Sequence, residues 1–463
     1  MKNIYKTLVV MGLFVAVSSC RKTETLDVDF NKYNLDQPKD DSELGQWLTK
    51  TFLDPYNMNV VYRYNRYYYG EPAADVAPLK AENVRPMMQT VLDGFIKPYT
   101  KIAGLPFVQK TNPKEWVLYG SPLYQTDGSA IAGTASGGRR ITLYGLNNYS
   151  TDYGFTKTRM FIIHHEFTHI LNQLVAIPVD FEGISEGTYK QPWNSTSAAV
   201  AKSNGFLGSY ASGSPTEDYA ETVATLLVSG QSYYDDYTNT APNDKAKLRL
   251  KQKALNAVNY FNTALNVDFR SLQREIQDYM QNEIKDPTLS FPYWMSKNLY
   301  KTMTINLEDP LYTANGVSED FRVPYEQLKD AILKFNGTVK YHLDNITLRF
   351  SSATALTVRL AISPAAGGGQ LFADYTFSYT VNPTTGAVVF TKIAQAGTAD
   401  YYANAAVFAT AFGSSIQAYL TGKTFIGAWM PKNINGGSYA DFGRLYVKDN
   451  PGNYFYGSLG QTL

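Results

Sequence analysis

The sequence has few of the residues that most often bind metal ions or form disulfides: four of its 463 residues are histidine and one is cysteine. A single thiol can neither form a disulfide within the chain nor supply two thiolates to zinc, so a disulfide framework and a cysteine-based zinc cluster are excluded. Net charge is nearly absent too, with 42 basic and 41 acidic residues, which argues against nucleic acid as a partner. The 44% of hydrophobic residues is enough for two or three packed domains.

The single cysteine follows a short apolar segment near the start of the sequence. Two lysines precede the apolar run from Leu8 to Val17, which is ten residues long and too short to span a bilayer of about 30 Å. This pattern is typical of a secretory signal peptide, and the small residues before Cys20 resemble a bacterial lipobox, whose cysteine is acylated. We therefore expect residues 1–19 to be a lipoprotein signal peptide and Cys20 to be the lipid anchor, with a buried structural cysteine as the alternative. A basic pair after the cysteine, where Asp would indicate inner-membrane retention, favours the outer membrane by the same resemblance.

Composition divides the rest of the chain into a tether and two folded parts. Residues 20–41 are polar and charged without an apolar period, which predicts a tether that follows the anchor. Residues 42–308 mix helical patterns with short strand-like runs. Residues 309–463 carry alternating runs separated by Gly, Pro and Asn turns, with one Ala-rich helical pattern at 399–420. We expect an α+β protein with a mixed first domain and a β-rich α+β C-terminal module of unknown function.

Apolar periodicity places several elements of the first domain. The predicted strands are Glu115–Tyr119 and Arg140–Leu146, the second after a glycine-rich turn at residues 137–138. The predicted helices are Asn83–Ile96, Thr156–Leu174, Pro215–Val228, and two stretches between Asp244 and Glu283 that are broken near Asn266.

Three of the four histidines lie within residues 164–169, HHEFTH, which contains the motif H-E-x-x-H. At about 100° per residue, His165 and His169 lie about 40° apart on the predicted helix, with Glu166 nearby and the apolar residues on the other side. Two histidines at this spacing can bind one Zn²⁺, and Glu166 can reach a metal-bound water as general base. The alternative is a solvent-exposed polar face, which would favour residues of better helix propensity. His164 points elsewhere and is expected to flank the site.

A catalytic zinc ion needs a third protein ligand. The remaining histidine, His342, lies in the β-rich module, so a carboxylate is favoured. Downstream candidates are Glu182, Glu186, Glu217, Asp218 and Glu221. Glu217 and Glu221 are the best placed, because residues four apart on a packed helix point the same way and a cation would offset their repulsion. Ser214 and Glu217 also fit a helix capping box, which is the competing interpretation of Glu217.

These motifs resemble a known family. HHEFTH followed by EDYAE, from Glu217 to Glu221, resembles the gluzincin metallopeptidases, and Tyr210 seven residues before Glu217 resembles the same stretch of anthrax lethal factor. Residues 46–229 resemble more closely the zinc-binding lipoprotein metallopeptidases encoded beside TonB-dependent nutrient-import systems in Bacteroides-like bacteria. The stretches that carry this resemblance are PYNMNVVYRY, PKEWVLYGS, GTASGG, RITLYGL, HHEFTHILNQ and GFLGSYASGSPTEDYAE.

The resemblance implies a zincin-like mixed α/β metallopeptidase domain that binds one Zn²⁺ ion and acts on a peptide or protein substrate. It implies these roles: His165, His169 and Glu217 as metal ligands, Glu166 as general base, Tyr210 as oxyanion donor, and Glu221 as the acceptor that orients a ligand imidazole. It further implies a lipid-anchored protein of the outer membrane or cell surface that is linked to a TonB-dependent import complex.

Two other features carry alternatives. Ile141 to Tyr144 could be an edge strand that aligns an extended peptide, or an ordinary core strand. A group of tyrosines could stack on sugars or pack internally. The group consists of Tyr62, Tyr64, Tyr67, Tyr68 and Tyr69. The sequence therefore predicts zinc-dependent peptide hydrolysis, with a non-catalytic glycan- or peptide-binding accessory lipoprotein of an uptake system as the alternative.

Overall fold

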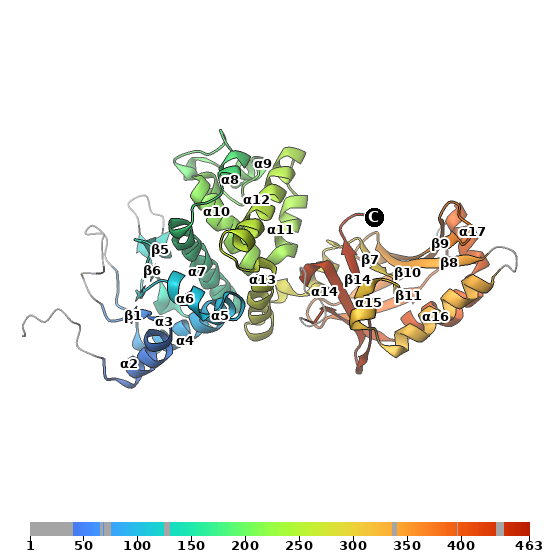
Figure 1. The fold of residues 1–463 in the computed structure, drawn as a ribbon, viewed down its shortest axis with the longest axis horizontal. Helices are drawn as coiled ribbons and strands as arrows, with labels where there is room; N and C mark the ends of the chain where they lie inside the picture. The colour runs from blue at the N-terminus through green and yellow to red at the C-terminus, as the bar shows by residue number, and fades with distance from the viewer. Residues whose placement is uncertain are drawn as a thin grey trace, which may run out of the picture. The chain divides into compact units, whose positions relative to one another are not determined.

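The computed structural model describes residues 40–64, 68, 76–124, 130–335, 340–395, 397–431 and 439–463 (Figure 1). The chain divides into two units, residues 1–48 and residues 49–463. The predicted signal peptide, Cys20 and nearly all of the tether lie outside the described residues. In the first unit, α2 (Glu43–Leu48) is a short helix with Leu48 buried. None of the helices that are described has the length and apolar character needed to cross a membrane.

A small mixed sheet forms one side of the candidate site. Its strands run in the order β1 (Asn59–Val61), β2 (Glu115–Leu118), β6 (Arg140–Leu143) and β5 (Gly133–Ser136). The first three strands are parallel, and β5 pairs antiparallel with β6. Both predicted strands form, but the second ends at Leu143 and not at Leu146, which begins the 3-10 helix η5 (Leu146–Asn148). The strand is not an edge: β6 lies between β2 and β5, and its Ile141 and Leu143 are fully buried.

The edge strand on this side of the sheet is β5, which pairs with β6. Gly137 and Gly138 adopt positive φ angles of 59° and 66°, a conformation that glycine reaches without a Cβ penalty, and this turn folds β5 back along β6. β5 reads GTAS and has no apolar alternation, which is why the sequence pattern did not indicate a strand there. A separate two-stranded ribbon of β3 (Leu123–Tyr124) and β4 (Ala130–Ile131) precedes it.

The long helix α7 (Tyr153–Leu174) packs against β5 and against α4 (Ala81–Val91). Asp152 caps its N-terminus by accepting from the backbone N–H of Gly154 at 2.8 Å. The helix ends before Pro178, as expected. Its core face consists of Met160, Ile163, Phe167, Ile170 and Leu171, none more than 2% exposed.

Further helices complete this part of the chain. The predicted 83–96 helix is α4 extended by a π-helical turn (Leu92–Ile96), followed by α5 (Lys97–Ala103) and α6 (Leu105–Thr111). α10 (Pro215–Ala224) packs on α7 and continues into the π-helical turn η8 (Thr225–Ser229). Further helices are α3 (Asp54–Tyr56), α8 (Val179–Ile184), α9 (Ala198–Ser203), α11 (Gly230–Asn239), α12 (Asp244–Thr263) and α13 (Phe269–Asp278), besides several short 3-10 and π-helical turns. The predicted break near Asn266 is confirmed, because that residue adopts a φ of 53° between α12 and α13.

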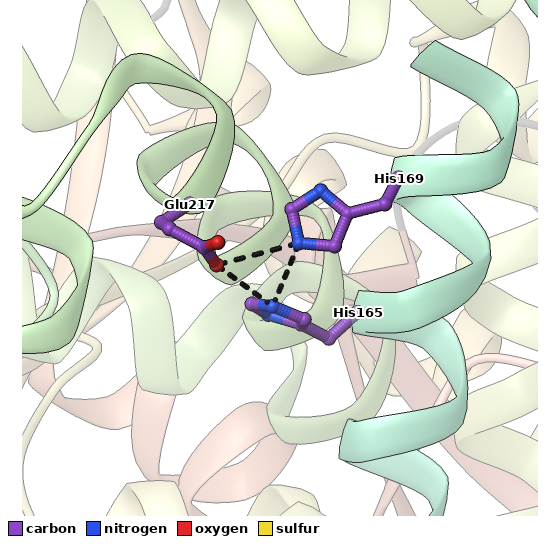
Figure 2. A group of neighbouring side chains, drawn as sticks. All are labelled: His165, His169 and Glu217. Atoms are coloured by element: carbon purple, nitrogen blue, oxygen red, sulfur yellow. Dashed lines mark hydrogen bonds and ion pairs between the residues drawn. The ribbon is translucent and has the colours of Figure 1, made fainter. Parts of the chain in front are cut away.

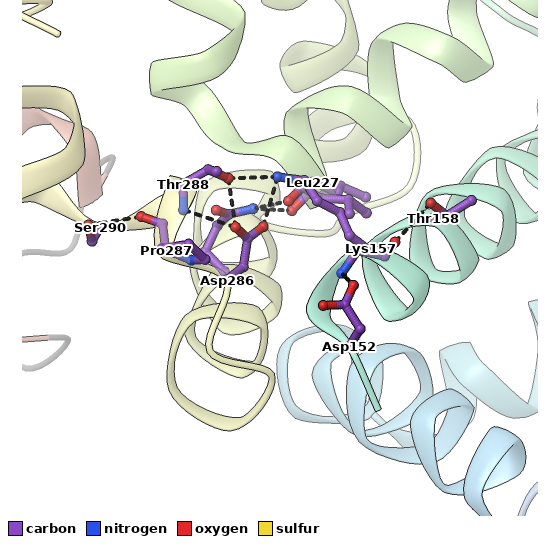
Figure 3. Close-up of polar contacts among 11 residues, drawn as sticks. Asp152, Lys157, Thr158, Leu227, Asp286, Pro287, Thr288 and Ser290 are labelled. Carbon is purple, nitrogen blue, oxygen red and sulfur yellow. Dashed lines mark hydrogen bonds and ion pairs between the residues drawn. The ribbon is translucent and has the colours of Figure 1, made fainter. Parts of the chain in front are cut away.

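A partly buried ion pair fixes the start of α7 (Figure 3). Lys157 Nζ lies 2.7 Å from Oδ2 of Asp286, whose side chain is fully buried, and donates to Oγ1 of Thr288 at 2.9 Å. Oδ1 of Asp286 in turn accepts from the backbone N–H of Thr288 at 2.9 Å. These contacts hold the segment after α13 against the helix that carries the histidines.

The C-terminal part is a closed antiparallel barrel with the strand order β10-β11-β12-β13-β14-β7-β8-β9. The strands are β7 (Thr302–Ile305), β8 (Tyr341–Phe350), β9 (Ala355–Pro364), β10 (Leu371–Val381), β11 (Ala387–Lys392), β12 (Thr424–Trp429), β13 (Phe442–Val447) and β14 (Asn450–Gly460). β7 belongs to the barrel but comes before residue 309, where we expected the module to begin. The strand is only four residues long and brings no change in composition, so the sequence pattern did not indicate it. The overall fold class is confirmed: a mixed α+β domain is followed by a β-rich α+β module.

Helices pack on the barrel and share its apolar core. They are α14 (Phe291–Ser296), α15 (Pro310–Asn315), α16 (Glu319–Lys334), α17 (Asp400–Val407), α18 (Ala409–Phe412) and α19 (Ala418–Leu420). Alternate residues of β9, including Val358 and Leu360, point into the same core as Phe321 and Leu328 of α16. The predicted Ala-rich helical pattern at 399–420 corresponds to the last three helices, with a π-helical turn between α18 and α19.

Candidate metal centre

Two adjacent helices bring three candidate ligands together (Figure 2). His165 and His169 are one turn apart on α7, and Glu217 is in the first turn of α10. Nε2 of His165 lies 3.1 Å from Nε2 of His169 and 3.1 Å from Oε2 of Glu217, and His169 Nε2 lies 3.3 Å from the same oxygen. Two imidazole nitrogens and a carboxylate oxygen thus converge on one point.

The local structure of α10 decides how Glu217 is used. Ser214 is the N-cap, and its Oγ accepts from the backbone N–H of Glu217 at 3.3 Å, with Pro215 at the first helical position. The carboxylate of Glu217 does not close a capping box but points to the histidines. The helix cap therefore uses the main-chain N–H of Glu217, and the Glu217 carboxylate remains available to contact the two histidines.

This geometry fits a metal ion. Zinc–nitrogen and zinc–oxygen bonds are about 2.0–2.1 Å, so neighbouring donors of a tetrahedral zinc ion lie about 3.3–3.4 Å apart. The three distances of 3.1, 3.1 and 3.3 Å are close to that value. Unprotonated imidazole nitrogens and a carboxylate oxygen also repel one another unless a cation or proton lies between them. Within the described part of the chain, these three residues form the one group of this kind.

The carboxylates around His165 also favour a positive charge at this site. Burial lowers the pKa of His165, but its hydrogen bonds with Glu217 and Glu221 outweigh burial and raise that pKa to about 10. Burial raises the pKa of Glu217, yet its hydrogen bonds with His165 and His169 bring the pKa well below the usual range of a carboxyl group. The carboxylates around His165 therefore favour positive charge at this site.

Glu221 lies on the other side of the His165 ring. Its Oε1 is 3.1 Å from Nδ1 of His165, which directs the opposite nitrogen, Nε2, towards His169 and Glu217. A carboxylate in this position fixes the orientation and tautomer of a ligand imidazole. Glu217 thus contacts Nε2 of the His165 ring, and Glu221 contacts Nδ1 of the same ring.

Glu166 faces a cleft of about 500 Å³ beside these residues. The cleft is lined by Ile131, Gly133, Thr134, Ala135, Glu166, His169, Asn172, Gln173, Tyr210, Thr216 and Glu217. Burial raises the pKa of Glu166, against the lowering effect of the two histidines and of a hydrogen bond from the Ala135 backbone. The edge strand β5 thus forms one wall of the cleft and contacts the candidate base directly.

Tyr210 lies at the opposite wall, in the short helix η7 (Tyr210–Ser212). Its ring centroid is 5.9 Å from that of His165, and it packs edge-on against Trp193 at 5.3 Å. The side chain is 40% exposed, so it is not an ordinary core tyrosine. Burial of its hydroxyl, followed by the charge of Glu217, raises its pKa, which keeps the phenol protonated as a hydrogen-bond donor.

Other candidates lie outside this group. His164 is fully buried on the far side of α7, where it stacks on Tyr99 at 5.9 Å and where burial lowers its pKa to about 3. Glu182 and Glu186 are exposed near α8, and His342 is in the barrel strand β8. Asp218 is fully buried and forms an ion pair with Lys253 instead.

Of the predicted tyrosine group, Tyr67 and Tyr69 lie outside the described residues. Tyr62 and Tyr68 are half-buried, and Tyr64 is 49% exposed with its ring against Tyr119. These three side chains therefore contribute partly to packing and partly to the surface.

The cleft wall formed by β5 has no signature in the residue pattern. Its GTAS stretch contributed only to the family resemblance, because small residues carry no strand period. Lys253 has no signature either, because it is one of several lysines in α12.

Comparison with known proteins gives the class of the chain. The model of a family described as "Putative zinc-binding metallo-peptidase" matches residues 37–270, just over half of the 463 residues. The chain belongs to this family of zinc-binding metallopeptidases. A crystal structure from Bacteroides caccae with the same description is 28% identical; the match covers 54% of this chain and 95% of that chain, with a TM-score of 0.46. A search of curated proteins gave no match.

Proposed function

We propose that the chain is a gluzincin-type peptidase that uses one zinc ion. The observation that carries the proposal is the convergence of His165, His169 and Glu217 beside a cleft that Glu166 faces. Zinc bound there would lower the pKa of a water molecule to about 7 and polarise a carbonyl group. With three protein donors, the site would leave a position open, as catalytic zinc sites do.

In this proposal Glu166 is the general base. It accepts a proton from the attacking water and passes it to the leaving nitrogen of the cleaved amide. Burial raises its pKa above that of an ordinary carboxyl group, the direction that suits a carboxylate that takes up and releases a proton. The hydrogen bond from the Ala135 backbone holds the carboxylate at the cleft wall.

The substrate would bind as an extended peptide along β5. One side of this strand pairs with β6 and the other side is the edge of the described sheet, so its outward N–H and C=O groups, apart from the Ala135 backbone group that Glu166 uses, can pair with a peptide backbone. Tyr210 would donate a hydrogen bond to the oxyanion from across the cleft, since its phenol stays protonated. Glu221 would keep the His165 ring in its binding orientation.

We also propose that the protein is anchored by lipid at Cys20 to the outer membrane or the cell surface and takes part in TonB-dependent nutrient import. The support is the short apolar run that ends at this cysteine, together with the family resemblance. Replacement of Cys20 by Ala should abolish incorporation of a labelled fatty acid and release the protein from the membrane fraction. Unchanged labelling would exclude this anchor.

The catalytic proposal is tested by metal content and cleavage together. We expect one zinc ion in the wild type, none in His165→Ala or Glu217→Ala, and cleavage of a peptide library that falls about 10²- to 10⁴-fold in Glu166→Gln without loss of zinc. Glu182→Gln, an exposed carboxylate outside the group, is the control and should leave both unchanged. Undiminished cleavage by Glu166→Gln would exclude it as the base. A zinc-loaded wild type that binds glycans or peptides but cleaves none would favour the accessory role.

A further inference from the structure

Lys253 of α12 is a fully buried cation to which the proposed chemistry assigns no role. Its Nζ lies 2.7 Å from Oδ2 of Asp218 and donates to the backbone carbonyl of Gly205 at 2.7 Å. Both side chains of the ion pair have no exposed surface, and the ammonium group also lies over the ring of Phe206, 4.1 Å from its centroid. Removing two charges from water is costly, so their interactions must be well oriented for the pair to persist.

The position of this pair relates it to the metal centre. Asp218 directly follows Glu217 on α10, and at about 100° per residue its side chain points to α12 while that of Glu217 points to α7. Tyr189, which precedes α9, donates from its hydroxyl to Oδ2 of Asp218 at 2.9 Å. The buried carboxylate is thus held by α12 and by the segment between α8 and α9.

Gly205, the second partner of Lys253, lies in the segment that carries Tyr210 of the cleft wall. The carbonyl of Gly205, which accepts from Nζ, lies five residues before Tyr210. Gly205 has a φ of 85°, and a Cβ there would lie 2.8 Å from Arg249 Cβ, so the backbone approaches α12 closely. Phe206 packs on Tyr189 with ring centroids 5.2 Å apart. One ammonium group therefore joins α10 to the chain that carries Tyr210.

We propose that Lys253 is a positioning residue of the metal site. By holding Asp218, it fixes the rotation of α10 about its axis and thereby the direction of the Glu217 carboxylate. By holding Gly205, it sets the distance between Tyr210 and that carboxylate. The metal-binding part of this inference depends on the convergence of the three donors, and its catalytic part rests on the proposed function.

The test replaces the whole pair, because removing one partner leaves a buried unpaired charge that threatens folding. The double variant Asp218→Leu/Lys253→Met keeps the volume and is expected to fold, since apolar replacement of a buried ion pair is often neutral or stabilising. It lacks the directed contacts, so the dissociation constant for zinc, measured by chelator competition, should rise about 10- to 100-fold. At saturating zinc, kcat should fall while KM stays unchanged, because the β5 wall is intact.

Arg359→Met/Asp374→Leu is the matched control. This pair joins β9 and β10 of the barrel through two hydrogen bonds of 2.7 Å and is also largely buried. It should leave zinc affinity unchanged. Tyr189→Phe is a milder variant that keeps the ion pair and should weaken zinc binding about 2- to 10-fold, the range typical of one lost hydrogen bond.

Two outcomes would overturn the inference. One is wild-type zinc affinity in a folded double variant or, if that variant does not fold, in Tyr189→Phe. The other is an equal loss of affinity in the barrel control. A wild type that binds zinc but cleaves no peptide would contradict the proposed function alone, because the comparison of zinc affinities would still decide the role of Lys253.

Discussion

Replacing Gly133 by Ala should separate zinc binding from peptide cleavage. A Cβ at this position of β5 would lie 2.3 Å from Cγ2 of Ile162 on α7, whereas ordinary contacts are at least 3.4 Å. The difference, 3.4 minus 2.3, requires a shift of about 1.1 Å. Ile162 cannot easily turn away, because a β-branched side chain in a helix has one strongly preferred χ1 rotamer. We therefore expect β5 to move away from α7.

A displacement of this size at the cleft wall should lower kcat/KM about 100-fold, equivalent to about 2.7 kcal/mol of transition-state stabilisation. Zinc affinity should not change, because the three candidate ligands lie on α7 and α10 and not on β5. Steady-state cleavage of a fluorogenic peptide and chelator competition measure the two quantities on the same preparation.

The second variant, Gly133→Ala/Ile162→Ala, makes the test specific. It removes the clashing methyl group, and the other neighbours of the new Cβ, Glu166 Cγ and Thr142 O, lie at an ordinary 3.6 Å. Cleavage should therefore recover to the level of Ile162→Ala alone. Wild-type kcat/KM in Gly133→Ala, or no recovery in the double variant, would refute the reasoning.

Three further predictions concern the metal centre and the barrel. Glu221→Gln should weaken zinc binding about 10- to 100-fold in chelator competition, since the His165 ring loses its carboxylate partner. Zinc at 100 times its dissociation constant should stabilise the wild type by about 2.7 kcal/mol, seen as a higher Tm that EDTA reverses and that His169→Ala lacks. In the barrel, hydrogen bonds to Asp344 and Glu308 raise the pKa of His342 above 6.5, so its stabilisation is complete below that pH and is lost as pH rises through the folded pKa. Urea midpoints at pH 6 and 8 should show this decline in the wild type and a smaller one in His342→Gln.

The parts of the site that depend on local sequence could be predicted. His165 and His169 share a helix face because they are four residues apart, and α7 forms because its apolar residues repeat with the helical period. Glu217 is different. It is 48 residues beyond His169, and its approach depends on how α10 packs on α7, which periodicity does not reveal. The residue pattern left several carboxylates open, and only the family resemblance selected Glu217.

Strand order in the sheet and closure of the barrel could not be predicted from the sequence pattern. The glycine pair at residues 137–138 predicted a turn, but strand order is a property of long-range pairing, so β6 could not be assigned to the centre and β5 to the edge. Alternating runs likewise predicted the strands of the C-terminal module. Its closure depends on β10 pairing with both β9 and β11, and on the short β7, whose four residues carry little pattern.

Closure of the barrel affects how the protein self-associates at high concentration. Among the described residues, each of its eight strands pairs with two neighbours, so none of these strands is an edge strand along its whole length. The four-stranded sheet of the other part, as far as the structure describes it, ends at the edge strands β1 and β5. Unwanted strand-to-strand aggregation of the folded protein would therefore start at this small sheet rather than in the strand-rich module. An extended peptide bound along β5 would also protect the protein against such self-association.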